Sequence, residues 1–371
     1  MNSISDNSSK YTNNSISITV WLVLLAIVLL VGGVLGIVVL GCVIFFSYLD
    51  IATDKASKHG ISEVDTSRLG GIAIWLSVLL YLLIMGFVPS SWVMFQFKFL
   101  GFEWIALAIA GIGLVDDFRF SITPALRLFL QFTIAGVGFY VSPELLPNGL
   151  PLFELLDSSF LSGLLSTLLL VGFVNAGNIA DGANGLLGLI LCCLFGFGFF
   201  ITHNDFYWII FFSVLTFTLF NLLTGKLFLG DFGAYSLSAI AVLVCFDIYN
   251  QIDISIWLFA CLLSYPCLEI SYVILFRIIQ NLPIYNSDNS HTHNRVFILV
   301  SKFEIGATGA NSLTGLLIAL LFAVTPFLIA VSNVWQLDSV NWLILFILLA
   351  FVFLAFNLLT IRSTRHTTNT L

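Results

Sequence analysis

Charge is scarce in this chain, since only 9% of its 371 residues are Asp, Glu, Lys or Arg, whereas 59% are hydrophobic. The mean hydropathy of +1.07 and the 37 phenylalanines exclude a soluble globular protein, because a fold of this size could not hide so much apolar surface from water. The sequence also lacks an internal repeat, a soluble domain and a long linker. We therefore expect one membrane domain over residues 17–361, with polar tails at 1–16 and 362–371.

Cysteine pairs at metal-binding spacing are absent as well. The six cysteines all fall in apolar runs and none forms a C-x-x-C pair, which argues against a zinc site or a disulfide framework. They are expected to be small apolar fillers.

The apolar residues fall into runs that approach the roughly 20 residues needed to cross a bilayer as a helix. The first run is too long for the apolar core of a cleaved signal peptide, so it is read as a retained span. The composition predicts an all-α, polytopic transmembrane helical bundle with about 10–11 spans. The eleven runs cover approximately residues 17–46, 70–89, 100–115, 124–142, 160–174, 185–201, 206–223, 235–249, 255–276, 312–333 and 340–361.

The basic residues predict an orientation. If the N-terminus lies outside, eleven of the 13 Lys and Arg fall on the inner side, as the positive-inside rule requires, and only Lys10 and Lys98 do not. The eleven are Lys55, Lys58, Arg68, Arg119, Arg127, Lys226, Arg277, Arg295, Lys302, Arg362 and Arg365.

In this topology four polar clusters from distant parts of the chain share the cytoplasmic face. They are Asp116-Asp117, the stretch from Asn175 to Asn184, Gly230-Asp231, and the segment His291-Thr-His293-Asn-Arg295. Such convergence is typical of an active site built on a helical bundle.

Each cluster has its own chemistry. Adjacent carboxylates repel one another unless a cation is near, so Asp116-Asp117 suggests a divalent metal, a proton acceptor or both, or else a solvated helix end paired with Arg119. Asp231 between glycines suits Mg²⁺ bound by one carboxylate, waters and phosphate oxygens, although G-D-x-G is also a common turn.

The other two clusters carry hydrogen-bonding groups. Asn175, Asn178 and Asp181 recur every three residues, which would place them on one face to read a base, a ribose or a sugar. His291 and His293 could donate to phosphate oxygens, or could lie idle in a solvated loop; zinc is less attractive there without a nearby cysteine or third histidine.

Taken in order, these motifs resemble those of the polyprenyl-phosphate N-acetylhexosamine-1-phosphate transferases. The resemblance rests on the aspartate pair, N-x-x-N-x-x-D-G-x-N-G-L, the N-x9-G-D-x-G motif that begins at Asn221, and H-x-H-x-R, and it spans residues 55–295. Lys58-His59-Gly60 and Arg68 look like the family's first cytoplasmic loop, and Arg127 and Gln131 also follow its pattern.

The resemblance implies transfer of an N-acetylhexosamine 1-phosphate, by default from UDP-GlcNAc, to undecaprenyl phosphate with release of UMP, which initiates a cell-envelope polysaccharide such as an O-antigen. It implies Mg²⁺ as the cofactor, with Mn²⁺ as an alternative, and a multi-pass location in the bacterial inner membrane. It further implies contact with membrane lipid and no nucleic-acid partner, and it allows a homodimer. Among the residues it implies Asp231 as metal ligand with Asp117 assisting, and Asp116 and Asp117 as catalytic. The substrate-binding residues that it implies are Lys58, His59, Arg68, Asn175, Asn178, Asp181, Asn184, Asn221, His291, His293 and Arg295.

Two departures from the family pattern stand out. Asn184 replaces a second aspartate found in many members, which bears on the sugar-specific branch, and Asn294-Arg295 stands where a further histidine is often found. A one-step displacement and a route through a phospho-aspartate both stay open.

Two other classes of protein remain to be weighed. A secondary transporter would place ionisable groups near the midplane, where only Glu269 lies, and this acid could instead be a buried structural group bonded to a neighbour. A noncatalytic scaffold would need no aspartates in three separate inner segments.

Overall fold

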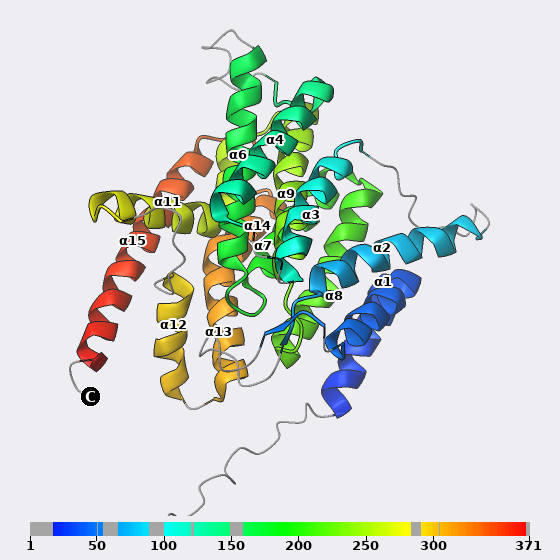
Figure 1. Cartoon of the computed structure of the whole chain (residues 1–371), viewed down its shortest axis with the longest axis horizontal. Coiled ribbons are helices and arrows are strands. Elements are labelled where there is room, and N and C mark those ends of the chain that lie inside the picture. Colours follow the sequence, from blue (N-terminus) through cyan, green and yellow to red (C-terminus); the bar gives the residue numbers. More distant parts are fainter. Residues whose placement is uncertain are drawn as a thin grey trace, which may run out of the picture.

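In a computed structural model the chain is an all-α bundle. The structure describes residues 18–49, 51–54, 66–88, 100–118, 120, 122–148, 159–282, 291–303 and 305–368. In Figure 1 the helices α3 (Glu103–Asp117), α6 (Ser159–Ala180), α7 (Leu186–Thr202) and α9 (Gly230–Gln251) occupy the middle of the molecule. The helices α1 (Ile18–Ser47), α2 (Gly70–Gly86) and α8 (Asp205–Thr224) lie to one side of them.

The other side is formed by the later helices (Figure 1). They are α10 (Ile256–Leu262), α11 (Ser264–Ile279), α12 (Thr292–Val300), α13 (Ala307–Ala319), the π-helical turn η4 (Leu320–Val324), α14 (Thr325–Val331) and α15 (Asn341–Thr368). The remaining elements are α4 (Pro124–Val141), the 3-10 turns η2 (Pro143–Leu145) and η3 (Ser301–Phe303), and a two-stranded ladder of β1 (Thr53–Asp54) and β2 (Thr66–Ser67).

Each of the eleven apolar runs coincides with a helix or a bent chain of helices. Within the described residues seven helices are long and apolar enough to cross a membrane, the bent pair α10–α11 makes an eighth, and α2 and α7 are shorter apolar helices. This confirms the prediction of an all-α polytopic bundle. The first run is not one straight helix, because Gly33 adopts φ 50° and ψ −128° inside α1.

Several helix boundaries differ from the expected ones where a polar motif turns out to be helical. Helix α6 continues to Ala180, so Asn175 and Asn178 lie in its last turns and not in a loop. Helix α9 begins at Gly230, and α12 begins at Thr292 inside the histidine motif. Hydrogen-bonded helix ends accommodate polar residues as readily as loops do, so loss of apolar periodicity marked the end of the apolar face and not the end of the helix.

Helix α9 lies at the centre of the core and packs most extensively against α3 and α6. Glycines permit these close crossings. A Cβ added to Gly71 of α2 would lie 2.1 Å from the Cα of Gly233, and one added to Gly113 of α3 would lie 2.5 Å from the carbonyl of Asp231. The start of α9 is therefore fixed between two neighbouring helices.

Candidate active site

The carboxylate of Asp117 holds the first turn of α9. Its Oδ1 accepts the backbone N–H of Asp231 and its Oδ2 accepts that of Phe232, each at 2.9 Å. The side chain is fully buried. Asp117 thus satisfies two N–H groups that the start of a helix leaves unpaired, and its charge complements the helix dipole. Because both of its oxygens already accept bonds, Asp117 anchors Asp231; its roles as catalytic acid and metal ligand stay predictions.

Arg68 joins the aspartates of α3 and α9. Its Nη2 lies 3.5 Å from Asp231 Oδ1 and its Nε lies 3.7 Å from Asp117 Oδ1. The segment around Arg68 is placed by backbone bonds to the loop before α9, from Ser67 N to Lys226 O and from Gly70 N to Phe228 O. These two connections, far apart in sequence, thereby place a guanidinium between two carboxylates.

Asp116 faces a different partner from Asp117. Its Oδ2 lies 3.2 Å from Arg127 Nη1 of α4, and its Oδ1 accepts the backbone N–H of Ile122 at 3.3 Å. One turn further along α4, Gln131 accepts a bond from Asn175 Nδ2 at 2.8 Å, while its own buried Nε2 has no hydrogen-bond partner within the described residues. The pair Asp116-Asp117 therefore divides between two arginines.

The polar residues from Asn175 to Asn184 also fall into two groups, one near the aspartates and one bonded within the protein. Asp181 is half-buried just beyond α6, where burial together with the charges of Asp231 and Asp117 raises its pKa well above the usual range, against the opposing effect of Arg68. Asn178 lies half-buried in the last turn of α6.

Asn184 and Asn221 instead bond within the protein. The buried Asn184 amide donates to Ser312 Oγ at 3.1 Å and accepts from Asn311 Nδ2 at 3.2 Å. Asn221 accepts from Gly185 N at 2.6 Å and donates to Leu227 O at 2.8 Å. These bonds fix the loop after α6, and the predicted contacts of Asn184 and Asn221 with nucleotide or sugar stay predictions.

The histidine motif lies against the same loop. A Cβ on Gly182 would come within 2.2 Å of His293 Nε2, so only glycine allows this approach. The rings of His291 and His293 stack with centroids 5.5 Å apart. The Arg295 guanidinium donates to Asn357 Oδ1 of α15 and, at 3.2 Å, to Thr292 Oγ1 of its own helix. Its predicted contact with phosphate stays a prediction.

The structure therefore brings Arg68, Asp116, Asp117, Asp181, Asp231 and the two histidines to the same end of the bundle. Lys58 and His59 lie outside the described residues. Sequence reasoning missed the partners Asn311, Ser312 and Asn357, although each is a polar residue within an apolar helix, which is the one signal that could have identified them.

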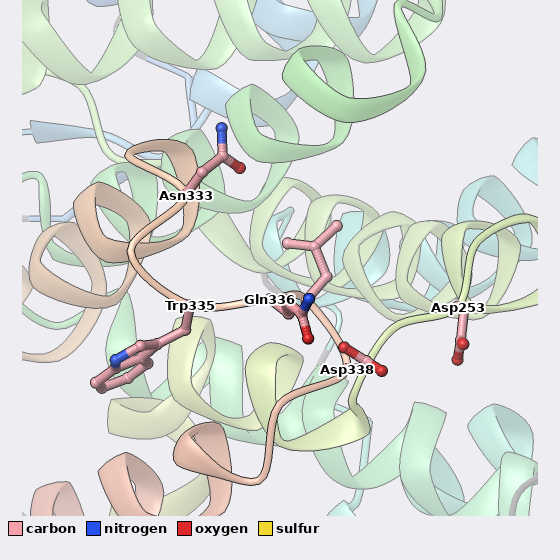
Figure 2. Close-up of a pocket in the computed structure, with 6 residues that line it drawn as sticks. Asp253, Asn333, Trp335, Gln336 and Asp338 are labelled. Carbon is pink, nitrogen blue, oxygen red and sulfur yellow. The ribbon is translucent and has the colours of Figure 1, made fainter.

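A second polar feature lies elsewhere. A cavity of about 420 Å³ is lined by Asp253, Asn333, Trp335, Gln336, Leu337 and Asp338 (Figure 2). It adjoins the C-terminal end of α9, about 30 Å from Asp231 at a rise of about 1.5 Å per residue. None of the predicted site residues lines it.

Comparison with known proteins agrees with the motifs. Residues 99–249 match the model of glycosyl transferase family 4. Over 311 residues the chain is 23% identical to the probable undecaprenyl-phosphate N-acetylglucosaminyl 1-phosphate transferase of Bacillus subtilis, across 81% of this chain and 82% of that protein. The chain therefore resembles glycosyl transferase family 4 over residues 99–249.

Two further relatives show the range of proteins to which the chain is similar. It is 28% identical over 274 residues to the decaprenyl-phosphate N-acetylglucosaminephosphotransferase of Mycobacterium leprae, across 64% of this chain and 68% of that protein. It is 28% identical over 202 residues to the phospho-N-acetylmuramoyl-pentapeptide-transferase of a Wolbachia from Brugia malayi, across 49% of this chain and 60% of that protein. With seven candidate spans among the described residues and these membrane-bound relatives, the chain is a multi-pass protein of the bacterial inner membrane.

The donor set suits Mg²⁺ bound together with a phosphate-bearing substrate. Asp181 lies close enough to Asp231 for the two carboxyl groups to interact electrostatically, and one or two carboxylates with substrate phosphates are the usual ligands of Mg²⁺. Among the described residues no three His, Cys, Asp or Glu side chains form a ready-made metal cage. The residues present therefore suit a metal that arrives with a diphosphate and not one held by protein alone.

Proposed function

We propose that this protein transfers an N-acetylhexosamine 1-phosphate from a UDP-sugar, by default UDP-GlcNAc, to undecaprenyl phosphate, releasing UMP and initiating a cell-envelope polysaccharide such as an O-antigen. The observation that carries the proposal is the convergence of Asp116, Asp181 and Asp231 with two arginines and two histidines at one end of the bundle. The names of the relatives support a polyprenyl phosphate acceptor and a sugar-phosphate donor.

The reaction is a displacement at phosphorus. An oxygen of the lipid phosphate forms a bond to the phosphorus that bears the sugar, and the bond from that phosphorus to the bridging oxygen of UMP breaks. Both reactants are anions, so the main catalytic requirement is to neutralise charge as they approach. When bound, Mg²⁺ would supply part of that neutralisation, held by Asp231 and Asp181.

The two arginines suit the two substrates. Arg127 lies beside Asp116, so this side of the site presents a guanidinium to the lipid phosphate. Arg68 lies between Asp231 and Asp117, on the side where the UDP-sugar diphosphate would bind. Asp116 then lies where it can accept or orient a proton on the lipid phosphate, which is already largely ionised near pH 7.

The test is transfer of radiolabelled sugar phosphate from a panel of UDP-N-acetylhexosamines to undecaprenyl phosphate by the purified protein. Labelled lipid and UMP should appear with Mg²⁺ and disappear with chelator or in Asp231→Asn. Asp253→Asn, an acid at the distant cavity, is the matched control and should retain activity. No product with any donor, from folded protein supplied with lipid and metal, would refute the proposal and favour a transport assay instead.

A further inference from the structure

One face of α11 contacts both histidines of the site. The chain bends by 81° between α10 and α11, and α11 runs across the neighbouring helices at the edge of the bundle in Figure 1. Tyr265 and Glu269, four residues apart, therefore lie on the same side of α11. Both are buried, and both bond to the segment that contains His291 and His293.

Glu269 determines which nitrogen of His291 carries a proton. Its Oε1 lies 3.2 Å from His291 Nδ1 and accepts the backbone N–H of Thr292 at 3.0 Å. A carboxylate that accepts two such bonds requires a proton on Nδ1. The Nε2 atom of His291 is then left for a ligand.

Tyr265 gives His293 the opposite arrangement. Its hydroxyl lies 3.1 Å from His293 Nδ1. Burial lowers the pKa of His293 to about 4, so this ring is neutral at pH 7 and carries a single proton. We assign the phenol as the donor to Nδ1, which places that proton on Nε2, the atom nearest Gly182.

Exposure separates the two rings further. The side chain of His291 is 16% exposed, whereas His293 as a whole is 3% exposed. Only His291 is open enough to meet a substrate, and His293 is enclosed between α11 and the loop after α6.

We propose that Glu269 and Tyr265 are positioning residues that give the stacked histidines opposite tautomers and separate tasks. His291, protonated on Nδ1 by its bond to Glu269, is the histidine that faces the substrate phosphate. His293, protonated on Nε2, positions the Gly182 loop and with it Asp181. The assignment of a phosphate to His291 rests on the proposed function, whereas the tautomers do not.

The tautomers can be read directly by nitrogen NMR of protein labelled at histidine, because the chain has only five histidines. His291→Gln and His293→Gln assign the signals. We expect Nδ1–H at His291 and Nε2–H at His293 in the wild type. Tyr265→Phe should change the His293 signals only, and Tyr272→Phe, one phenol removed from the same helix two turns later, should change neither.

Activity provides the second readout. Glu269→Ala should lower kcat by about 10- to 100-fold, the loss expected for one charge-assisted hydrogen bond, with a smaller change in KM for the UDP-sugar. Glu269→Gln, which keeps an oxygen for both N–H groups, should recover part of the loss; it also serves if the alanine variant does not fold.

The outcomes separate the two proposals. His291 signals without an Nδ1 proton, or unchanged in both Glu269 variants, would overturn the positioning role whatever the activity. The expected tautomers in a protein that transfers no sugar phosphate would uphold the positioning role and refute the proposed function.

Discussion

The bond between Asp117 and the start of α9 predicts a particular phenotype for Asp117→Asn. The carboxylate accepts two backbone N–H groups, and an amide in its place has one oxygen to accept with. One buried N–H would then face an NH₂ group, and the charge that favours the helix N-terminus would be gone. We expect a loss of about 2 kcal/mol of stability, the usual cost of one charged hydrogen bond.

Thermal unfolding of the purified protein in detergent measures this loss. A change of about 2 kcal/mol corresponds to a fall in Tm of a few degrees, roughly 2–5 °C for a chain of this length. Because Asp231 sits on the turn that Asp117 holds, kcat should fall together with Tm. Asp117→Glu should not restore either, since the longer side chain displaces the carboxylate from the two N–H groups.

The reasoning has a clear point of failure. An Asp117→Asn protein that melts like the wild type but transfers no sugar phosphate would mean that the carboxylate acts on the ligand and not on α9. Asp253→Asn provides the baseline for removal of an acid far from this turn.

Three other variants test the packing around the site. Gly71→Ala places a methyl group against the backbone of Gly233 and should lower stability by about 1–3 kcal/mol. In the control Gly86→Ala the added methyl group meets open space, so stability should not fall. Equal melting temperatures for the two variants would contradict the close crossing of α2 and α9. The pKa of His293 is about 4 in the folded protein, below the ordinary 6.5, so between these two pH values the unfolded chain binds a proton at this residue and the folded chain does not. The free energy of unfolding should therefore fall as the pH is lowered from about 6.5 to 4, by about 3 kcal/mol in total. His293→Gln should flatten that decline in melting curves recorded across the range, and an unchanged slope would count against a buried neutral ring. Asn357→Leu removes the oxygen on α15 that accepts from the Arg295 guanidinium and should make α12 more sensitive to proteolysis. Asn357→Asp keeps an oxygen at this position and should stay near the wild type.

The sequence predicted the helices well because apolar length is a local property. The position of Asp116-Asp117 at the end of α3 followed from the same signal. Polar residues were harder, since an amide near a helix end can bond to a ligand or to another helix. Asn184 bonds to Asn311, 127 residues later, and no local pattern indicates that partner.

The different partners of Asp116 and Asp117 could not be predicted from the local sequence either. Adjacent acids look equivalent in sequence, yet successive helical residues point about 100° apart, so Asp116 and Asp117 meet different helices. Glu269 was the exception, because an acid inside an apolar run suggested a buried, hydrogen-bonded group, and its bonds to His291 and Thr292 confirm it.

The bond between Arg295 and Asn357 links the site to the order in which the protein is made. The two histidines lie at the start of α12, and the Asn357 amide that accepts from Arg295 of that helix lies on α15, the last helix of the described chain. During synthesis from the N-terminus the aspartates of α3 and α9 can meet early, whereas the histidine helix gains its final support only when α15 has entered the membrane. Completion of the site thus coincides with completion of the bundle, and a nascent chain that stops before α15 would carry its acids in place and its histidines unsecured.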